Sequence, residues 1–381
     1  MKPLRSSWMD ADLELYRDQV RRFVAAEIVP RQAAWREQRR VDRTVWRRAG
    51  EMGLLLADIP AAYGGAGGSY AHMAVLWEAL VQADEAGFGS HVHALAAHHI
   101  HRHGTEAQKL RYLPRLASGE WIAAIAMTEP AAGSDLQNIA ATAVRRDGGY
   151  RLNGSKSFVS NGQLADLVLL AAKTDPAASQ GGISLLLVET GNLAGFQRGP
   201  VLELIGRRGQ DACELFFDDA FIPADAVLGG IEGKGISQIG KAMPYERTLL
   251  GIVAVAAIER AVELTADHAR GRKLFGKSLF DLQNTRFKLA EAQTQAVVGR
   301  VFIDWCIERM IAGDMEADIA AMAKWYLTDM QCTVIDECLQ LFGGYGYCLE
   351  YPIAQMYADA RVQKIYGGAN EVMKEIIAYS M

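Results

Sequence analysis

Two short segments near the middle of the chain carry residue types suited to holding a flat, polar ligand. The first reads Met-Thr-Glu-Pro-Ala-Ala-Gly-Ser-Asp over 127–135, and the second reads Asn-Gly-Ser-Lys-Ser-Phe-Val-Ser-Asn-Gly over 153–162. Glycine lets the backbone approach a ligand closely, and free N–H and O–H groups supply hydrogen bonds. Phe158 adds an aromatic ring to the second segment. The pattern indicates a binding site for such a ligand.

These segments resemble the flavin-binding motifs of the acyl-CoA dehydrogenase family. The resemblance implies that the first segment holds the pyrophosphate and the isoalloxazine edge of FAD, and that the second lays an aromatic against the flavin and offers a hydroxyl near its N5. Phe158 and Ser160 stand where many members have Trp and Thr, and both changes keep the chemistry. The implied FAD contacts are Ile125, Met127, Thr128, Gly133, Ser134, Phe158, Val159 and Ser160.

Two C-terminal segments resemble further cofactor motifs of this family. Arg272, Phe275 and Gln283 match an RxxFGxxLxxxQ pattern, in which the arginine pairs with the FAD pyrophosphate of a neighbouring subunit. Guanidinium and phosphate form strong bidentate contacts. The alternative is an arginine that caps the end of a helix. The same residues, 271–278, also fit the P-loop pattern GxxxxGK[ST], but a P-loop needs a preceding buried strand and 255–270 has a helical pattern.

The companion segment contains Gln340, Gly343 and Gly344 and resembles a QxxGG turn that meets the adenine end of FAD across a subunit boundary. A glycine that follows an apolar helical run also fits a helix C-cap, and both roles are compatible. The cross-subunit contacts imply a homo-oligomer, usually a tetramer in the family.

Dehydrogenation between Cα and Cβ of a thioester needs a base for the α-proton, while the flavin N5 takes a hydride from Cβ. Most family members place this glutamate in a C-terminal Tyr-Glu-Gly-Thr motif. Here that stretch reads Tyr-Gly-Gly-Ala over 366–369, so the acid is missing at Gly367. The long-chain and isovaleryl types carry the base on an interior helix, where this chain has Glu246. We therefore predict that Glu246 is the catalytic base.

Two other interpretations of the acidic residues are weaker. Glu246 could be a surface residue paired with Arg247, but adjacent residues on a helix do not face each other. Glu371 lies four residues past the expected slot, and the resemblance puts it, with Ala369, beside the flavin. The backbone N–H of Gly367 would still polarise the thioester carbonyl. The predicted substrate contacts are Ser134, Tyr245, Arg247, Gly367 and Gly368.

The hydrophobic pattern predicts three parts that position these residues. Apolar residues recur at helical spacing over 1–121, short apolar runs and turn signals indicate strands over 122–232, and the helical period returns over 233–381. Long apolar faces at 249–262, 282–298, 301–311 and 319–339 predict a four-helix bundle. We expect an α+β protein with a helical N-terminal domain, a middle β-barrel and a C-terminal bundle, as in the family.

Composition excludes several classes of protein. The net charge of −5 argues against nucleic acid as a partner. No run of about 18 apolar residues predicts a membrane span, and no apolar secretion signal is present, so we expect a cytoplasmic protein. The five cysteines show no CxxC spacing and are expected to be free thiols.

Six of the eight histidines fall within 91–103. His99 and His103 are spaced i, i+4 and could share a helix face, as metal ligands do. No carboxylate or cysteine lies close by, so no metal is predicted. Because this segment borders the acyl pocket in the family, His91 and His93 hint at a polar or unusual acyl chain.

The predicted function is FAD-dependent oxidation of an acyl-CoA to a trans-2-enoyl-CoA, with electrons passed to an electron-transferring flavoprotein. An oxidase or monooxygenase on the same scaffold is one alternative. A non-catalytic, FAD-loaded binding protein is the other.

Overall fold

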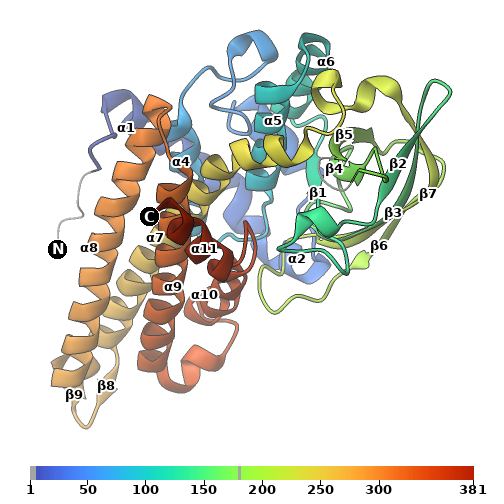
Figure 1. Cartoon of the computed structure of the whole chain (residues 1–381). Helices are drawn as coiled ribbons and strands as arrows, with labels where there is room; N and C mark the ends of the chain where they lie inside the picture. Colours follow the sequence, from blue (N-terminus) through green and yellow to red (C-terminus); the bar gives the residue numbers. More distant parts are fainter. Residues whose placement is uncertain (1–5, 179–181) are drawn as a thin grey trace.

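A computed structural model describes residues 6–178 and 182–381. It has helices at both ends of the chain and a sheet between them (Figure 1). This arrangement confirms the predicted three-part fold. The N-terminal helices are α1 Ala11–Phe23, α2 Gln32–Gln38, α3 Arg43–Glu51, α4 Tyr70–Gln82, α5 Ser90–His103 and α6 Glu106–Ala117.

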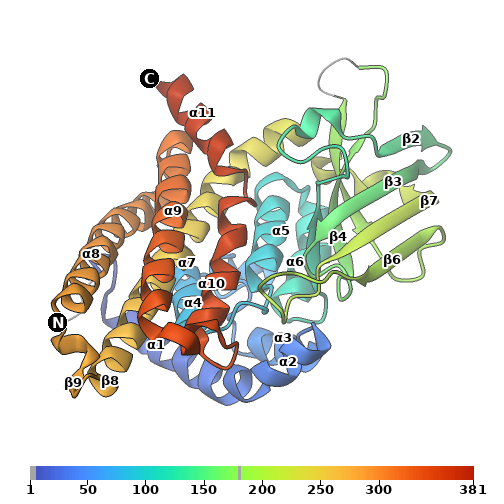
Figure 2. The ribbon, with the colours of Figure 1, turned by 90° about the horizontal axis from the view of Figure 1, so that it is seen from below.

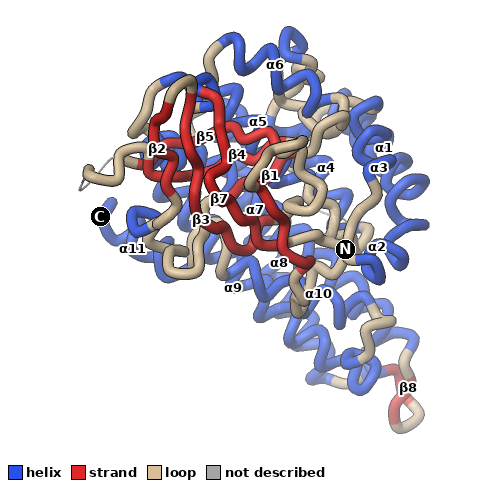
Figure 3. The backbone as a smooth tube through the Cα atoms, turned by 90° about the vertical axis from the view of Figure 1, so that its right-hand side faces the viewer, coloured by secondary structure: helices blue, strands red, loops and turns tan. Residues whose placement is uncertain are grey.

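The middle part is a curled seven-stranded sheet (Figure 3). The strand order is β1-β4-β2-β3-β7-β6, and β5 pairs with β4. The β1–β4 and β2–β4 pairs are parallel and the others are antiparallel. The strands are β1 Ala123–Ala126, β2 Thr142–Arg146, β3 Gly149–Val159, β4 Leu167–Lys173, β5 Ile183–Glu189, β6 Phe196–Val201 and β7 Cys213–Pro223.

The C-terminal part is built around three long helices, with two shorter ones packed on α9 (Figure 2). The two faces predicted at 282–298 and 301–311 belong to one continuous helix, α8, so the prediction of a break there was wrong. Gly299 lies at this point and allows close packing, because a Cβ there would be 2.6 Å from Met330 Cε. The elements are α7 Gly235–Gly271, β8 Lys273–Leu274, β9 Lys277–Ser278, α8 Gln283–Ala312, α9 Ala317–Phe342, α10 Pro352–Ala360 and α11 Asn370–Ser380.

Helix α7 is the centre of the molecule because it packs against α9, α8, α4 and α5. It continues through Pro244, which removes one backbone donor without ending the helix. One apolar core joins the N-terminal and C-terminal helices, and a second fills the sheet. Across residues 6–178 and 182–381, every helix is too short or too polar to span a bilayer.

Candidate functional site

Glu246 lies on α7, beside the turn at 366–369 that leads into α11. A Cβ added to Gly367 would be 3.4 Å from Glu246 Oε1 and 3.7 Å from its Cδ. The helix-borne carboxylate therefore reaches the place where a side chain at position 367 would begin. Two predicted site residues that are distant in the sequence are brought together here.

The backbone at the turn explains why position 367 is glycine. Gly367 has φ +64°, and a Cβ there would lie 2.5 Å from Leu250 Cδ1. Gly368 follows with φ +90°. Side chains rarely adopt these angles, so a glutamate at 367 would be both strained and obstructed. The Gly367 N–H makes no backbone hydrogen bond within the described chain.

The Glu246 carboxylate makes no hydrogen bond or ion pair with any described residue, although it is only partly open to solvent. Burial raises its pKa, and the nearby charges of Arg247 and Lys324 offset part of this rise. A carboxylate without partners and with a raised pKa is suited to accept a proton near neutral pH.

Lys324 on α9 fixes the turn at 366–369 by hydrogen bonds. Its side chain is fully buried, and Nζ donates to the Gly368 carbonyl and to Asn370 Oδ1, each at 2.7 Å. Asn370 Nδ2 donates in turn to Thr328 Oγ1 at 3.1 Å. Desolvation, followed by the charge of Arg247, lowers the pKa of Lys324 to about 8. This lysine was not predicted as a site residue, although a charged residue on the apolar face of 319–339 was a signal.

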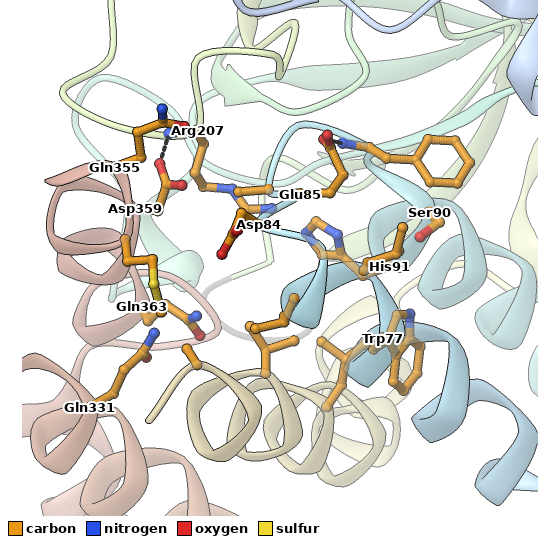
Figure 4. A pocket seen from close by; sticks show the side chains of 18 of the residues that line it. Trp77, Asp84, Glu85, Ser90, His91, Arg207, Gln331, Gln355, Asp359 and Gln363 are labelled. Carbon is orange, nitrogen blue, oxygen red and sulfur yellow. Dashed lines mark hydrogen bonds between the residues drawn. The ribbon is translucent and has the colours of Figure 1, made fainter. Parts of the chain in front are cut away.

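A cavity of about 760 Å³, counted with its opening, lies between α4, α5, α7, α9 and α10 (Figure 4). Leu249 and Val253 line it about one and two helical turns beyond Glu246, on the same side of α7. Trp77 forms part of another wall. The cavity therefore lies along the side of α7 that carries Glu246.

Of the clustered histidines, His91 lines this cavity and burial lowers its pKa to about 3. His93 instead braces the fold, because its ring bonds the Leu116 carbonyl at 3.0 Å and the Ala123 N–H at 3.1 Å. The His99 and His103 ring centroids are 6.2 Å apart. No group of three possible metal ligands occurs among the residues the structure describes.

Tyr245 and Arg247 flank Glu246 but differ in their surroundings. The Tyr245 hydroxyl donates to Asp58 at 2.8 Å, and its ring stacks on His98 with centroids 4.3 Å apart. Its side chain therefore packs within the fold, and the substrate contact expected from the sequence stays a prediction. Arg247 is buried, and its Nη2 lies 3.9 Å from a Cβ placed on Gly368.

The two segments predicted to hold the flavin are joined by a buried ion pair. Lys156 Nζ lies 2.6 Å from Glu129 Oε1 and also donates to the Met127 carbonyl at 3.1 Å. The Ser157 N–H donates to the Thr128 carbonyl at 2.9 Å. Sequence reasoning did not single out Lys156 or Glu129, because one charged residue in a strand gives no indication of its partner.

Several residues of these segments face outward as a ligand site requires. Phe158 is 68 % exposed with φ +56°, and Gly133 and Ser134 are exposed. A Cβ added to Gly133 would meet nothing within 4 Å. An exposed aromatic ring held in a rarely used backbone conformation indicates a face that a flat group covers. The half-buried residues Ile125, Met127, Thr128 and Ser160, and the buried Val159, lie beside this face in sequence.

The C-terminal cofactor residues lie elsewhere in the subunit. Arg272 and Phe275, which is 92 % exposed, belong to the β8–β9 hairpin at the far end of α7, away from the sheet (Figure 1). The Arg272 guanidinium lies over the Tyr345 ring at 5.6 Å, so this hairpin meets the turn after α9. Helix α7, not a strand, precedes the hairpin, which excludes a P-loop. The other exposed residues in this set are Gln283, Gln340, Gly343 and Gly344.

Comparisons with known proteins agree with this geometry. The N-terminal, middle and C-terminal domain models of acyl-CoA dehydrogenase match residues 10–120, 124–220 and 233–381. The mitochondrial long-chain specific acyl-CoA dehydrogenase of Mus musculus is 42 % identical over 368 residues, covering 96 % of this chain and 85 % of the relative.

Solved structures give the same result. An acyl-CoA dehydrogenase from Geobacillus kaustophilus has a TM-score of 0.95 and 40 % identity, with 99 % of each chain covered. A glutaryl-CoA dehydrogenase from Mycobacterium smegmatis, in complex with FADH2, has a TM-score of 0.90 and 27 % identity, with 98 % of this chain and 95 % of that chain covered.

Proposed function

This chain belongs to the acyl-CoA dehydrogenase family, and on that premise we propose that Glu246 is its catalytic base. The reaction is the FAD-dependent oxidation of an acyl-CoA thioester to a trans-2-enoyl-CoA. The observation that carries the assignment is the unpartnered Glu246 carboxylate, 3.4 Å from the position of a Cβ on Gly367. Most of the family places its acid at that turn.

The roles of the chain's own groups follow from their chemistry. Glu246 takes the α-proton, and its raised pKa matches it to a weakly acidic C–H group. The Gly367 N–H is available to the thioester carbonyl, and removal of one such donor costs about 10²–10³ in rate. Lys324 keeps that N–H in position through the Gly368 carbonyl.

The residues around Phe158 fit FAD, because they offer an exposed aromatic ring beside open glycine backbone. FAD, when bound, supplies the acceptor for the hydride that leaves Cβ. Thr128, Ser134 and Ser160 would contribute hydroxyls around it. Arg272, with the glycines at 343 and 344, would hold the pyrophosphate and adenine end from a neighbouring subunit.

We also propose that the chain forms a homo-oligomer, specifically a tetramer. The separation of the two sets of cofactor residues within one chain supports it, as do exposed apolar side chains on α8 such as Val301 and Trp305. An electron-transferring flavoprotein is the proposed electron acceptor, and fatty acid metabolism the proposed setting. A cytoplasmic location stays a prediction, since the Mus musculus relative is mitochondrial.

An anaerobic titration tests the reaction. Saturated acyl-CoA thioesters of increasing chain length are added to the FAD-loaded protein, flavin absorbance is followed, and the product is identified by mass and by trans-2-enoyl absorbance. We expect bleaching, stoichiometric enoyl-CoA, and rapid reoxidation by an electron-transferring flavoprotein but slow reoxidation in air.

The same titration separates the alternatives. Fast reoxidation in air with peroxide or an oxygenated product would indicate an oxidase or monooxygenase. FAD binding without bleaching by any thioester would indicate a non-catalytic protein. Either result would contradict the proposed function.

A further inference from the structure

Two buried amides line the cavity beyond the catalytic carboxylate. Gln331 on α9 and Gln363 in the turn after α10 are each 2 % exposed. Neither Gln331 Oε1 nor Gln363 Oε1 has a donor among residues 6–178 and 182–381. Both amides are directed toward the cavity interior, with His91 and Trp77 on another wall (Figure 4). A buried amide without a partner is destabilising, so such a pair indicates a ligand that satisfies it.

The carboxylates in the same wall already have partners. Asp84 forms an ion pair with Arg260 at 3.1 Å. Glu85 accepts hydrogen bonds from the Gly87 and Phe88 N–H groups at 2.6 and 2.9 Å. Asp359 accepts from the backbone N–H of Arg207. These acids therefore do not compete for a group of the substrate.

Two basic side chains, Arg207 and His91, also line the cavity. Arg207 donates through Nε to Gln210 Oε1 at 3.0 Å and through Nη1 to the Tyr366 hydroxyl at 3.3 Å. His91 is neutral, since burial lowers its pKa. The guanidinium is thus engaged by neutral partners, and the imidazole adds another group that can donate or accept.

The spacing along the helices places the amides well beyond the reacting carbons. Lys324 lies near Glu246, and a Cβ on Gly251 would lie 3.1 Å from Leu327 Cδ1, so α9 runs beside α7 in the same direction. Gln331 follows Lys324 by about two turns, which is roughly 10 Å along the axis. Leu249 and Val253 supply apolar wall over this interval. A chain entering from Glu246 would cross an apolar section before it meets the amides.

We propose that this enzyme oxidises acyl-CoA thioesters whose chain carries a hydroxyl group several carbons beyond Cβ, bound by Gln331 and Gln363. This inference rests on the proposed dehydrogenase function. An amide presents an acceptor and two donors, and a hydroxyl both donates and accepts, so it satisfies either amide. A plain alkyl chain would leave both amide oxygens without donors. An ionised carboxylate has no proton to donate, so it would leave both amide oxygens without donors as well.

The test compares three matched series of thioesters by anaerobic flavin reduction: plain alkyl chains, chains with the hydroxyl moved one carbon at a time, and chains ending in carboxylate. We expect one hydroxyl position to raise kcat/KM about tenfold to a hundredfold over the alkyl chain of equal length. Preference for alkyl or for carboxylate chains would overturn the inference while leaving the dehydrogenase intact. If no thioester of any of the three series reduced the flavin, the proposed function itself would be refuted.

Two variants assign the preference to the amides. Gln331→Met and Gln363→Met should each lower kcat/KM for the hydroxylated chain about tenfold and raise it for the alkyl chain. Each should also raise Tm, because an unsatisfied buried amide is removed. Gln295→Met is the matched control: Gln295 is a half-buried residue of α8 outside the cavity whose Oε1 is also buried without a partner, and its replacement should leave the preference unchanged. An unaltered preference in both cavity variants would contradict the proposal.

Discussion

A half-buried carboxylate without a hydrogen-bond partner destabilises a fold, and Glu246 is such a carboxylate. Burial raises its pKa, so the folded state favours the protonated form. Stability is therefore greatest at pH below the unfolded pKa and falls as pH rises through the folded pKa. An acid at this position lowers the stability of the fold at neutral pH, and its proposed role as the base that removes the α-proton explains why it is present.

The first prediction concerns this cost. Glu246→Gln should have a higher Tm than the wild type at neutral pH, because the amide carries no charge to desolvate. The difference should shrink as the pH is lowered toward the pKa of an ordinary glutamate. Thermal melts from pH 4 to pH 8, with FAD bound, would measure it. A variant less stable than wild type at neutral pH would show that the carboxylate is structurally required.

The second prediction concerns the glycine opposite this carboxylate. Gly367→Ala should cost about 1–3 kcal/mol of unfolding free energy, because φ is +64° and the new Cβ would lie 2.5 Å from Leu250 Cδ1. It should also lower kcat. Gly313→Ala is the control: φ is +76° there, and a Cβ would meet nothing within 4 Å. Denaturant melts should show a larger loss of unfolding free energy for Gly367→Ala than for Gly313→Ala. Equal losses would contradict the predicted clash with Leu250, because backbone strain alone would then account for both.

At this scale, the sequence predicted the residues that belong to motifs. Glu246 and Gly367 were predicted as site residues because the family's acid is missing at position 367 and an acid is present on the interior helix. Lys324, Gln331 and Gln363 were missed, since a single polar residue in an apolar helix shows neither its depth nor its neighbours. For Tyr245 the structure shows a hydroxyl bound to Asp58, and the predicted substrate contact stays a prediction.

At the scale of elements, α7 carries the base while α9 supports the turn that faces it. Lys324 connects the two, because it donates to the turn at Gly368 and its charge offsets part of the rise in the pKa of Glu246. A shift of α9 would therefore change both the position of the Gly367 N–H and the proton affinity of the base.

The third prediction follows from this connection. Lys324→Met should lower kcat about 10²-fold, with a smaller effect on KM, because the donor at Gly367 is no longer fixed. The acidic limb of the pH–rate profile should also move to higher pH, since a charge that lowers the Glu246 pKa is lost. Lys288→Met, a change at a half-buried lysine on α8 that pairs with Glu337, is the control. A lower kcat with an unmoved acidic limb would indicate a purely structural role.

The periodicity of apolar residues predicted which segments are helices and which are strands, but it did not predict where a helix runs on without a break. The pattern suggested a break near residues 299 and 300, whereas α8 runs through because Gly299 makes room for Met330. Pro244 is likewise compatible with an unbroken α7. In both places tertiary packing outweighs local propensity, and a single sequence does not contain that information directly.

At the scale of the whole molecule, one subunit does not bring its two sets of predicted cofactor residues together. Phe158 lies at the end of β3 in the sheet, whereas Arg272 lies on the hairpin beyond α7 (Figure 1). The order of the three parts was predictable from the sequence because it follows the change in hydrophobic period. The number of subunits was not, since it depends on how surfaces fit.

The fourth prediction tests whether the cofactor site spans two subunits. Phe158→Ala and Arg272→Ala should each retain little FAD after gel filtration. When the two variants are co-expressed with different affinity tags and purified through both, some sites combine two intact halves. FAD content and activity should therefore recover in part. Absence of recovery in a confirmed mixed oligomer would contradict a shared site.

The base assignment is tested most directly by the rate of flavin reduction in a single anaerobic turnover. The wild type, Glu246→Gln and Glu371→Gln proteins are mixed with the best thioester in a stopped-flow instrument, after equal FAD loading is verified. We predict that Glu246→Gln is slower by about 10²–10⁴-fold while Glu371→Gln stays within about tenfold of the wild type. A Glu246→Gln protein that bleaches at the wild-type rate would contradict the assignment.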